Sequence, residues 1–160
     1  MEEIFSYNAF IKEKIYRKMV KYCAYQDRCH SDVMKKMSEL KTDDEIAEEV
    51  IVKLIEEGYL NEERFVRSFI RGKFRINKWG KIKIRAELKL NNVNEKLISD
   101  CMSEIDENEY KATLKQLLET KLKSLKPLEK YKIRNKLKSY VWGRGYDPEL
   151  TEIILQELEI

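Results

Sequence analysis

The chain is poor in the residues that interrupt helices. Only five Gly and two Pro occur among its 160 residues, and no stretch rich in Ser, Gly and Pro separates one part from another. Glu, Lys and Leu, which favour helices, are abundant instead. The sequence therefore predicts an all-α chain without a separate second domain.

Cysteine and histidine are also scarce, which argues against disulfides, metals and catalysis. The three cysteines cannot all pair within one chain, and the spacing of Cys23, Cys29 and His30 matches no usual zinc pattern. His30 is the only histidine and has no nucleophile motif such as G-x-S-x-G to act on, and no phosphate-binding loop or G-x-G-x-x-G is present. We expect no metal, no cofactor and no enzymatic activity.

Long apolar runs are missing as well. No segment approaches the roughly 20 apolar residues that a membrane span needs, and the N-terminal MEEIFSYNAFIKEK carries acids where a signal peptide has positive charge. Free thiols fit a reducing compartment. The sequence predicts a soluble cytoplasmic protein that makes no membrane contact.

The clearest helix is predicted over residues 43–57, where apolar residues recur on one stripe. A Thr42-x-x-Glu45 capping box is expected to open it and Gly58 to close it. The same apolar rhythm returns after Asn94, and again after Asp147-Pro148. Three helices of one design are thus predicted.

These helices belong to a repeat of about 50 residues. In front of each lies a second matching segment, at 33–40, 84–90 and 133–140, offset by 51 and then 49 residues. A further helix precedes each pair, at roughly 9–26, 61–75 and 107–124. We predict about nine helices forming three tandem three-helix, helix-turn-helix-like repeats, at about 8–57, 58–106 and 107–160, stacked into an elongated, curved body.

Charge is sorted along the chain, although the net charge is only +3. Between Arg64 and Lys89 the one acid is Glu87. Because a solvated helix normally interleaves Glu with Lys, this apparent lack of compensating acids favours a surface for an anionic partner. The predicted contact residues are Arg64, Arg67, Arg71, Lys73, Arg75, Lys78, Lys81, Lys83 and Arg85, with Trp79 as an anchor.

Simpler interpretations compete with this one. Arg and Lys also solvate the outer faces of packed helices, and a lone Trp near a helix start often packs in a core. Phe65 and Phe69, spaced by four residues, are expected in the core. The anionic partner could be an acidic protein surface, DNA phosphate or both, and composition does not choose among them.

Residues 58–88, GYLNEERFVRSFIRGKFRINKWGKIKIRAEL, together with KYCAYQDRCHSDVMKKM at 21–37, resemble the RecX family of RecA regulators. The densest match comprises Gly58, Leu60, Asn61, Glu63, Arg64, Phe65, Phe69, Gly80, Ile84, Glu87 and Leu88. Two departures affect loops: Asn92 stands where the family often has Gly, and the last repeat carries WGRGYDPEL.

The resemblance implies a cytoplasmic, non-enzymatic protein that binds the RecA filament in its helical groove and limits recombinase activity or filament growth. We expect it to act as a monomer. Two other functions stay open from the residues alone. One is direct DNA binding, because each repeat holds short helices and the isoelectric point is about 8.6. The other is a charged helical scaffold in which basic segments meet acidic ones.

Overall fold

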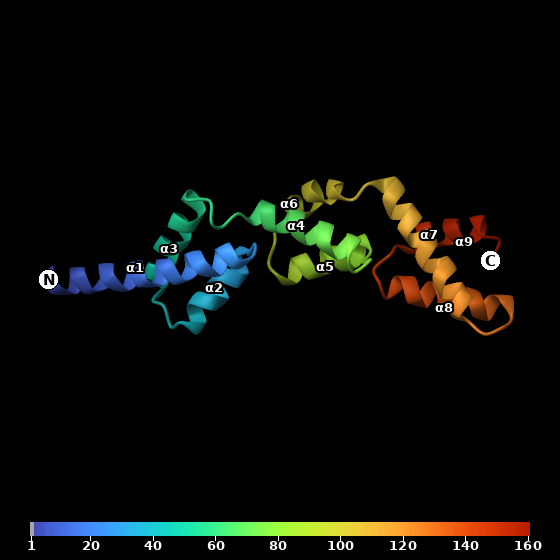
Figure 1. Ribbon diagram of the computed structural model, residues 1–160, viewed down its shortest axis with the longest axis horizontal. Coiled ribbons are helices and arrows are strands. Elements are labelled where there is room, and N and C mark those ends of the chain that lie inside the picture. The colour runs from blue at the N-terminus through green and yellow to red at the C-terminus, as the bar shows by residue number, and fades with distance from the viewer. Residues whose placement is uncertain (1) are drawn as a thin grey trace. The chain divides into compact units, whose positions relative to one another are not determined.

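The computed structural model describes residues 2–160, whose backbone forms nine α-helices, one 3₁₀ turn and no β-strand (Figure 1). The helices are α1 (Glu2–Tyr25), α2 (His30–Glu39), α3 (Asp44–Glu56), α4 (Glu62–Arg75), α5 (Lys81–Leu90), α6 (Glu95–Cys101), α7 (Glu107–Ser124), α8 (Lys130–Trp142) and α9 (Pro148–Glu157). The 3₁₀ turn at Met102–Glu104 follows α6 directly. The predicted all-α fold of about nine helices is confirmed, whereas the repeat boundaries and the elongated outline stay predictions.

Side chains at the predicted positions start α6 and α9. The Asn94 side chain accepts the backbone N–H of Lys96, and the Asp147 side chain accepts that of Leu150, with Pro148 in the first turn of α9. Each contact satisfies an N–H that the helix itself leaves without a partner.

The capping box predicted at Thr42 is wrong. Asp43 caps α3, and its carboxylate accepts the backbone N–H of Glu45 at 3.0 Å. Thr42 still belongs to the turn after α2, because its N–H donates to the carbonyl of Met37 at 3.0 Å. Its hydroxyl is buried without a hydrogen-bond partner among the described residues.

A residue in the left-handed conformation ends the turn after the second helix of each predicted repeat. Lys41 has φ of 52°, Asn92 has φ of 57° and Gly145 has φ of 89°. Asn tolerates this region better than most side chains, which explains how Asn92 can replace a glycine. Gly58, with φ of 77°, ends α3 as predicted.

The chain divides into two compact units. The first comprises the residues up to Ser68 together with Asn91–Val93. Its core is formed by Ile15, Tyr16, Met19, Cys23, Val33, Met37, Ala47, Val50, Leu54 and Leu60. The Ser31 hydroxyl donates to the carbonyl of Asn91 at 2.7 Å, which fixes the 91–93 turn against α2.

The second unit comprises Phe69–Leu90 and Asn94–Ile160. Within it the ring of Tyr110 stacks on Tyr146 at a centroid distance of 5.0 Å and meets Phe74 at 5.8 Å. In α4 the fully buried positions are Val66, Ile70 and Phe74, whereas Phe65 and Phe69 are only half-buried. The core stripe of α4 is therefore displaced by one residue from the one predicted.

Two glycines bring backbones into contact inside the second unit. The N–H of Gly80 donates to the carbonyl of Arg144 at 2.7 Å, and that of Ile82 donates to the carbonyl of Gly145 at 3.0 Å. A Cβ on Gly80 would lie 2.2 Å from the carbonyl carbon of Gly145. Only glycine fits here, and the contact fixes the loop that enters α5.

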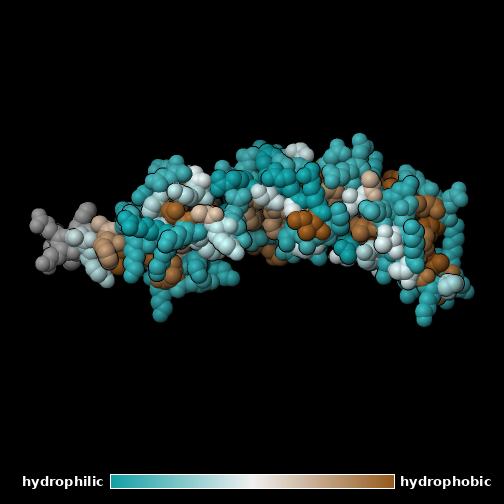
Figure 2. All heavy atoms as spheres, in the orientation of Figure 1, coloured by the Kyte–Doolittle hydropathy of each residue, from teal (hydrophilic) through white to brown (hydrophobic). Residues whose placement is uncertain are grey.

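The surface in Figure 2 is mostly hydrophilic, with apolar residues emerging singly or in small groups. Among the described residues, no helix combines the length and the apolar character that crossing a bilayer requires. The three cysteines are free and buried, and burial raises the pKa of the Cys29 thiol to about 11. That thiol is therefore protonated and unreactive near neutral pH.

Candidate interaction surface

The ten predicted contact residues lie on α4, on α5 and on the loop between them. Arg64 and Arg67 belong to the first compact unit, and the other eight belong to the second. Those eight are Arg71, Lys73, Arg75, Lys78, Trp79, Lys81, Lys83 and Arg85.

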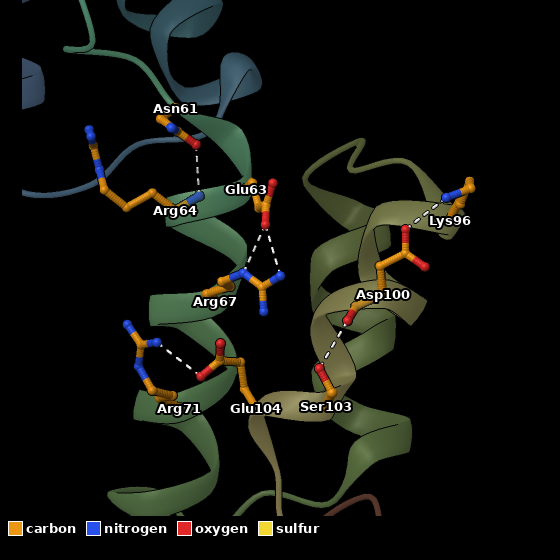
Figure 3. Close-up of polar contacts among 9 residues, drawn as sticks. All are labelled: Asn61, Glu63, Arg64, Arg67, Arg71, Lys96, Asp100, Ser103 and Glu104. Atoms are coloured by element: carbon orange, nitrogen blue, oxygen red, sulfur yellow. Dashed lines mark hydrogen bonds and ion pairs between the residues drawn. The ribbon is translucent and has the colours of Figure 1, made fainter.

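Arg64 is held by three acceptors of the first unit. Its Nε donates to the Asp27 carboxylate at 2.7 Å, and its terminal nitrogens donate to the carbonyls of Gly58 at 3.1 Å and Tyr59 at 3.3 Å. Its backbone N–H donates to the side chain of Asn61, which caps α4 (Figure 3). Arg64 thus holds the connection between α3 and α4 in place.

Arg67 and Arg71 each face a carboxylate (Figure 3). The guanidinium of Arg67 contacts Glu63, one turn earlier on α4, at 2.8 and 2.9 Å. Within the second unit, Arg71 donates to Glu104, from the 3₁₀ turn, at 2.9 Å. Glu104 lies 33 residues further along the chain, so sequence proximity did not reveal this pair.

Three more of the predicted residues also meet acids. Arg75 lies 3.8 Å from the Glu109 carboxylate at the start of α7. Lys81 pairs with Glu107, and its ammonium lies 4.7 Å from the ring centroid of Tyr110. Arg85 pairs with Glu95, and its guanidinium also donates to the Ser99 hydroxyl at 3.2 Å.

The expected lack of compensating acids is therefore wrong for six of the ten residues. The fold brings acids from α6, α7 and the 3₁₀ turn to cations that have almost none nearby in sequence. The Arg75 and Arg64 side chains are 57% and 45% exposed, so such pairs contribute only about 0–1 kcal/mol each. They do, however, reduce the charge available to a partner.

Two of the three remaining cations lie over one aromatic ring, and the third adjoins it in sequence. The ammonium groups of Lys73 and Lys83 lie 4.7 and 4.3 Å from the ring centroid of Trp79. Lys78 precedes Trp79 directly, with φ of 56°. Within the part of the chain that the structure describes, these three lysines have no carboxylate within ion-pair distance. Lys73, Lys78, Trp79 and Lys83 are called the Trp79 cluster below.

Trp79 is half-buried, between the two roles considered for it. Its backbone N–H donates to the carbonyl of Lys73 at 3.0 Å, so the loop folds back on the end of α4. The ring attracts both ammonium groups through its electron-rich face. Trp79 thus holds two lysines close together despite their mutual repulsion.

Exposed apolar side chains flank the Trp79 cluster in sequence. Ile76 is 81% exposed and Ile82 is 52% exposed. Each lies three residues from Trp79. Both are apolar side chains that remain exposed close in sequence to the uncompensated lysines.

Sequence reasoning missed Arg144, which contacts the loop that carries Trp79. Arg144 donates from its guanidinium to the carbonyl of Asn77 at 3.3 Å, while its own carbonyl accepts the N–H of Gly80. The available signal was the Gly143-Arg144-Gly145 run, which is typical of a turn but does not indicate what that turn contacts.

Comparison with known proteins adds independent information. The family model described as the second three-helix domain of RecX matches residues 61–102, and the model of the third three-helix domain matches residues 108–155. The two models together cover more than half of the chain.

Curated relatives carry the same name. The regulatory protein RecX of Lactobacillus gasseri is 24% identical over 139 residues, which are 87% of this chain and 51% of the relative. That of Bacillus cytotoxicus is 25% identical over 147 residues, 92% of this chain and 54% of the relative. The chain therefore spans about half the length of these relatives.

The helical architecture is found in solved structures too. The crystal structure of RecX from Lactobacillus salivarius superposes with a TM-score of 0.87 at 21% identity, covering 94% of this chain and 98% of that one. Another crystal structure of regulatory protein RecX gives a TM-score of 0.83 at 22% identity, covering 91% of this chain and 73% of that one. At these identities the likeness concerns the fold.

Proposed function

This chain belongs to the RecX family, and we propose on that basis that it regulates homologous recombination and DNA repair by binding the RecA filament and limiting recombinase activity. Such a regulator acts in the cytoplasm, by stoichiometric binding and not by catalysis. The recombinase is the partner that the family resemblance implies.

The observation that carries the proposal at the residue level is the Trp79 cluster. Its three lysines lack carboxylate partners among the described residues, and Ile76 and Ile82 stand exposed on either side in sequence. Tryptophan is one of the residue types that supply most of the binding free energy at protein interfaces. The cluster therefore fits an acidic protein surface with apolar neighbours.

The predicted contact residues divide by this criterion. Lys73, Lys78, Trp79 and Lys83 are placed to meet the recombinase directly. The six acid-paired residues, Arg64, Arg67, Arg71, Arg75, Lys81 and Arg85, are proposed as weaker contacts, because each would have to exchange an existing carboxylate for one on the partner. Truncating one of these six should weaken binding less than truncating a cluster lysine.

The test is RecA-dependent ATP hydrolysis on single-stranded DNA, titrated with this protein up to stoichiometric amounts. The triple variant Lys73→Glu, Lys78→Glu, Lys83→Glu should raise the half-inhibitory concentration by about tenfold or more, since about 1.4 kcal/mol corresponds to one factor of ten. Circular dichroism should show unchanged helix content, because the three side chains reach the surface.

The matched control makes the same charge change at three lysines outside the cluster. Lys14, Lys18 and Lys21 are exposed on α1, and their replacement by Glu should leave inhibition unchanged. If both triple variants lost inhibition to the same extent, net charge, and not this cluster, would govern binding. Absence of inhibition by the unaltered protein would overturn the recombinase as partner.

A further inference from the structure

A groove in the second compact unit lies between α7 and α8, outside the surface described above. Its lining consists of Lys121, Leu125, Asn135, Lys136, Ser139 and Tyr140. Apart from Leu125, every one of these side chains carries a hydrogen-bond donor. None of them is an acid.

This lining differs from that of other grooves on the molecule. The groove between α1 and α3 contains five glutamates, Glu13, Glu48, Glu49, Glu56 and Glu57, beside two lysines. Lysine, asparagine, serine and tyrosine are the side chains that contact phosphate oxygens in nucleic-acid complexes. The composition of the α7–α8 groove therefore matches an anionic ligand.

The cations at the groove are held by the ring of Tyr140. The ammonium of Lys121 lies 5.2 Å from its centroid, and the guanidinium carbon of Arg144 lies 4.9 Å from it. Arg144 also donates to the carbonyl of Asn77. Because Arg144 contacts both Tyr140 and the loop that precedes Trp79, the groove lies beside the Trp79 cluster in the same unit.

The two lysines of the groove lack the carboxylate partners that neighbouring basic residues have. Lys132 pairs with Glu129 at 3.0 Å, and Lys138 and Arg134 both pair with Glu152. Lys121 and Lys136 have no carboxylate within ion-pair distance among the described residues. Two uncompensated lysines beside amide and hydroxyl donors leave positive charge directed at the groove.

From this chemistry we propose that the α7–α8 groove binds the phosphodiester backbone of a nucleic acid. An acidic protein partner would also need apolar contact, which Ile76 and Ile82 offer near the Trp79 cluster, whereas the lining of this groove holds only one aliphatic residue, Leu125. The uncompensated cations of the groove are Lys121 and Lys136, and lysine contacts phosphate as a point charge. Backbone contact of this kind carries no base specificity.

The contact is separate from recombinase binding and is tested without it. A fluorescein-labelled oligothymidine strand is titrated with the full chain, and binding is followed by fluorescence anisotropy at several salt concentrations. The variant Lys121→Ala, Lys136→Ala should weaken binding about tenfold or more at low salt. The slope of log affinity against log salt should fall in magnitude by about 1.4, since each single-strand phosphate contact contributes about 0.7.

The matched control removes two lysines that do have partners. Lys96 pairs with Asp100 at 2.8 Å and Lys132 with Glu129 at 3.0 Å, so Lys96→Ala, Lys132→Ala removes the same charge without emptying the groove. This control should keep most of the affinity and most of the salt slope. If the first double variant does not fold, the single variant Lys136→Ala, on the exposed side of α8, is tested instead. The magnitude of its salt slope should fall by about half as much as expected for the double variant.

Each outcome decides the proposal. Equal affinity of groove and control variants would overturn it and leave Lys121 as a cation that balances the C-terminal end of the α7 dipole. Displacement of the strand by polyglutamate as readily as by unlabelled DNA would also overturn it, in favour of an acidic protein. Inhibition of RecA that persists in the groove variant would separate this site from the proposed function.

Discussion

Replacing Gly80 by Ala should disrupt the packing of the second compact unit, because Gly80 is buried there. The new Cβ would lie 2.2 Å from the carbonyl carbon and oxygen of Gly145 and 2.4 Å from the nitrogen of Tyr146. All three are backbone atoms, which cannot rotate away as a side chain would. A change of rotamer cannot relieve this overlap, so the backbone of the 144–146 turn must move away from residue 80.

The cost follows from the contacts that this retreat breaks. The Gly80–Arg144 and Ile82–Gly145 backbone hydrogen bonds would be lost, each contributing about 0.5–1.5 kcal/mol. The stacking of Tyr146 on Tyr110 would also be disturbed, at about 0.5–1.5 kcal/mol. We expect the free energy of unfolding to fall by about 3 kcal/mol, a large effect for one methyl group.

Gly72 provides the matched control, because it lies inside α4 and a Cβ there would meet nothing within 4 Å. Gly72→Ala should stabilise the protein by about 0.5–1 kcal/mol, as alanine favours helix. Urea unfolding followed by tryptophan fluorescence suits both variants, since Trp79 and Trp142 lie in the second unit. A loss below about 1 kcal/mol for Gly80→Ala would refute the close-contact reasoning.

Substitutions at two further positions, Glu152 and Asn92, test local chemistry. Hydrogen bonds from Lys138 and then Arg134 hold the pKa of Glu152 below its usual value, so its contribution to stability is present above the unfolded-state pKa and is lost as the pH falls through the folded one. Glu152→Gln should therefore lower the melting temperature at neutral pH, and the difference should vanish once the pH falls below the folded-state pKa of Glu152; equal melting temperatures at neutral pH would contradict this pairing. At Asn92, with φ of 57°, Gly should change the free energy of unfolding by less than about 0.5 kcal/mol, whereas Val should cost about 1–2 kcal/mol in urea unfolding. Similar values for Gly and Val would show that the turn does not require the left-handed conformation.

Local sequence signals predicted the helices well because their causes are local. Periodic apolar residues, Asn94 and Asp147-Pro148 at helix starts, and Gly58 at a helix end depend on neighbours within one turn. The errors arose where two local signals competed. Thr42 and Asp43 could both cap α3, and the hydrogen bond of Thr42 to Met37 decided for Asp43.

The basic surface shows the limit of that reasoning. Counting charges between Arg64 and Lys89 found one acid, yet six of the predicted contact residues meet carboxylates from elsewhere in the fold or from just outside that window. Charges interact through space over several ångströms, whatever their separation along the chain. The count identified the right region but not which cations in it lack a partner.

The sequence by itself determined that this chain is helical, where its helices lie and which family it resembles, because propensity, capping and apolar periodicity act over a few residues. Tertiary structure decided which lysines stay uncompensated, that Trp79 and Tyr140 each hold two cations, and that Gly80 must meet Gly145. Those features join residues tens of positions apart, and only packing of the helices brings their side chains and backbones within a few ångströms.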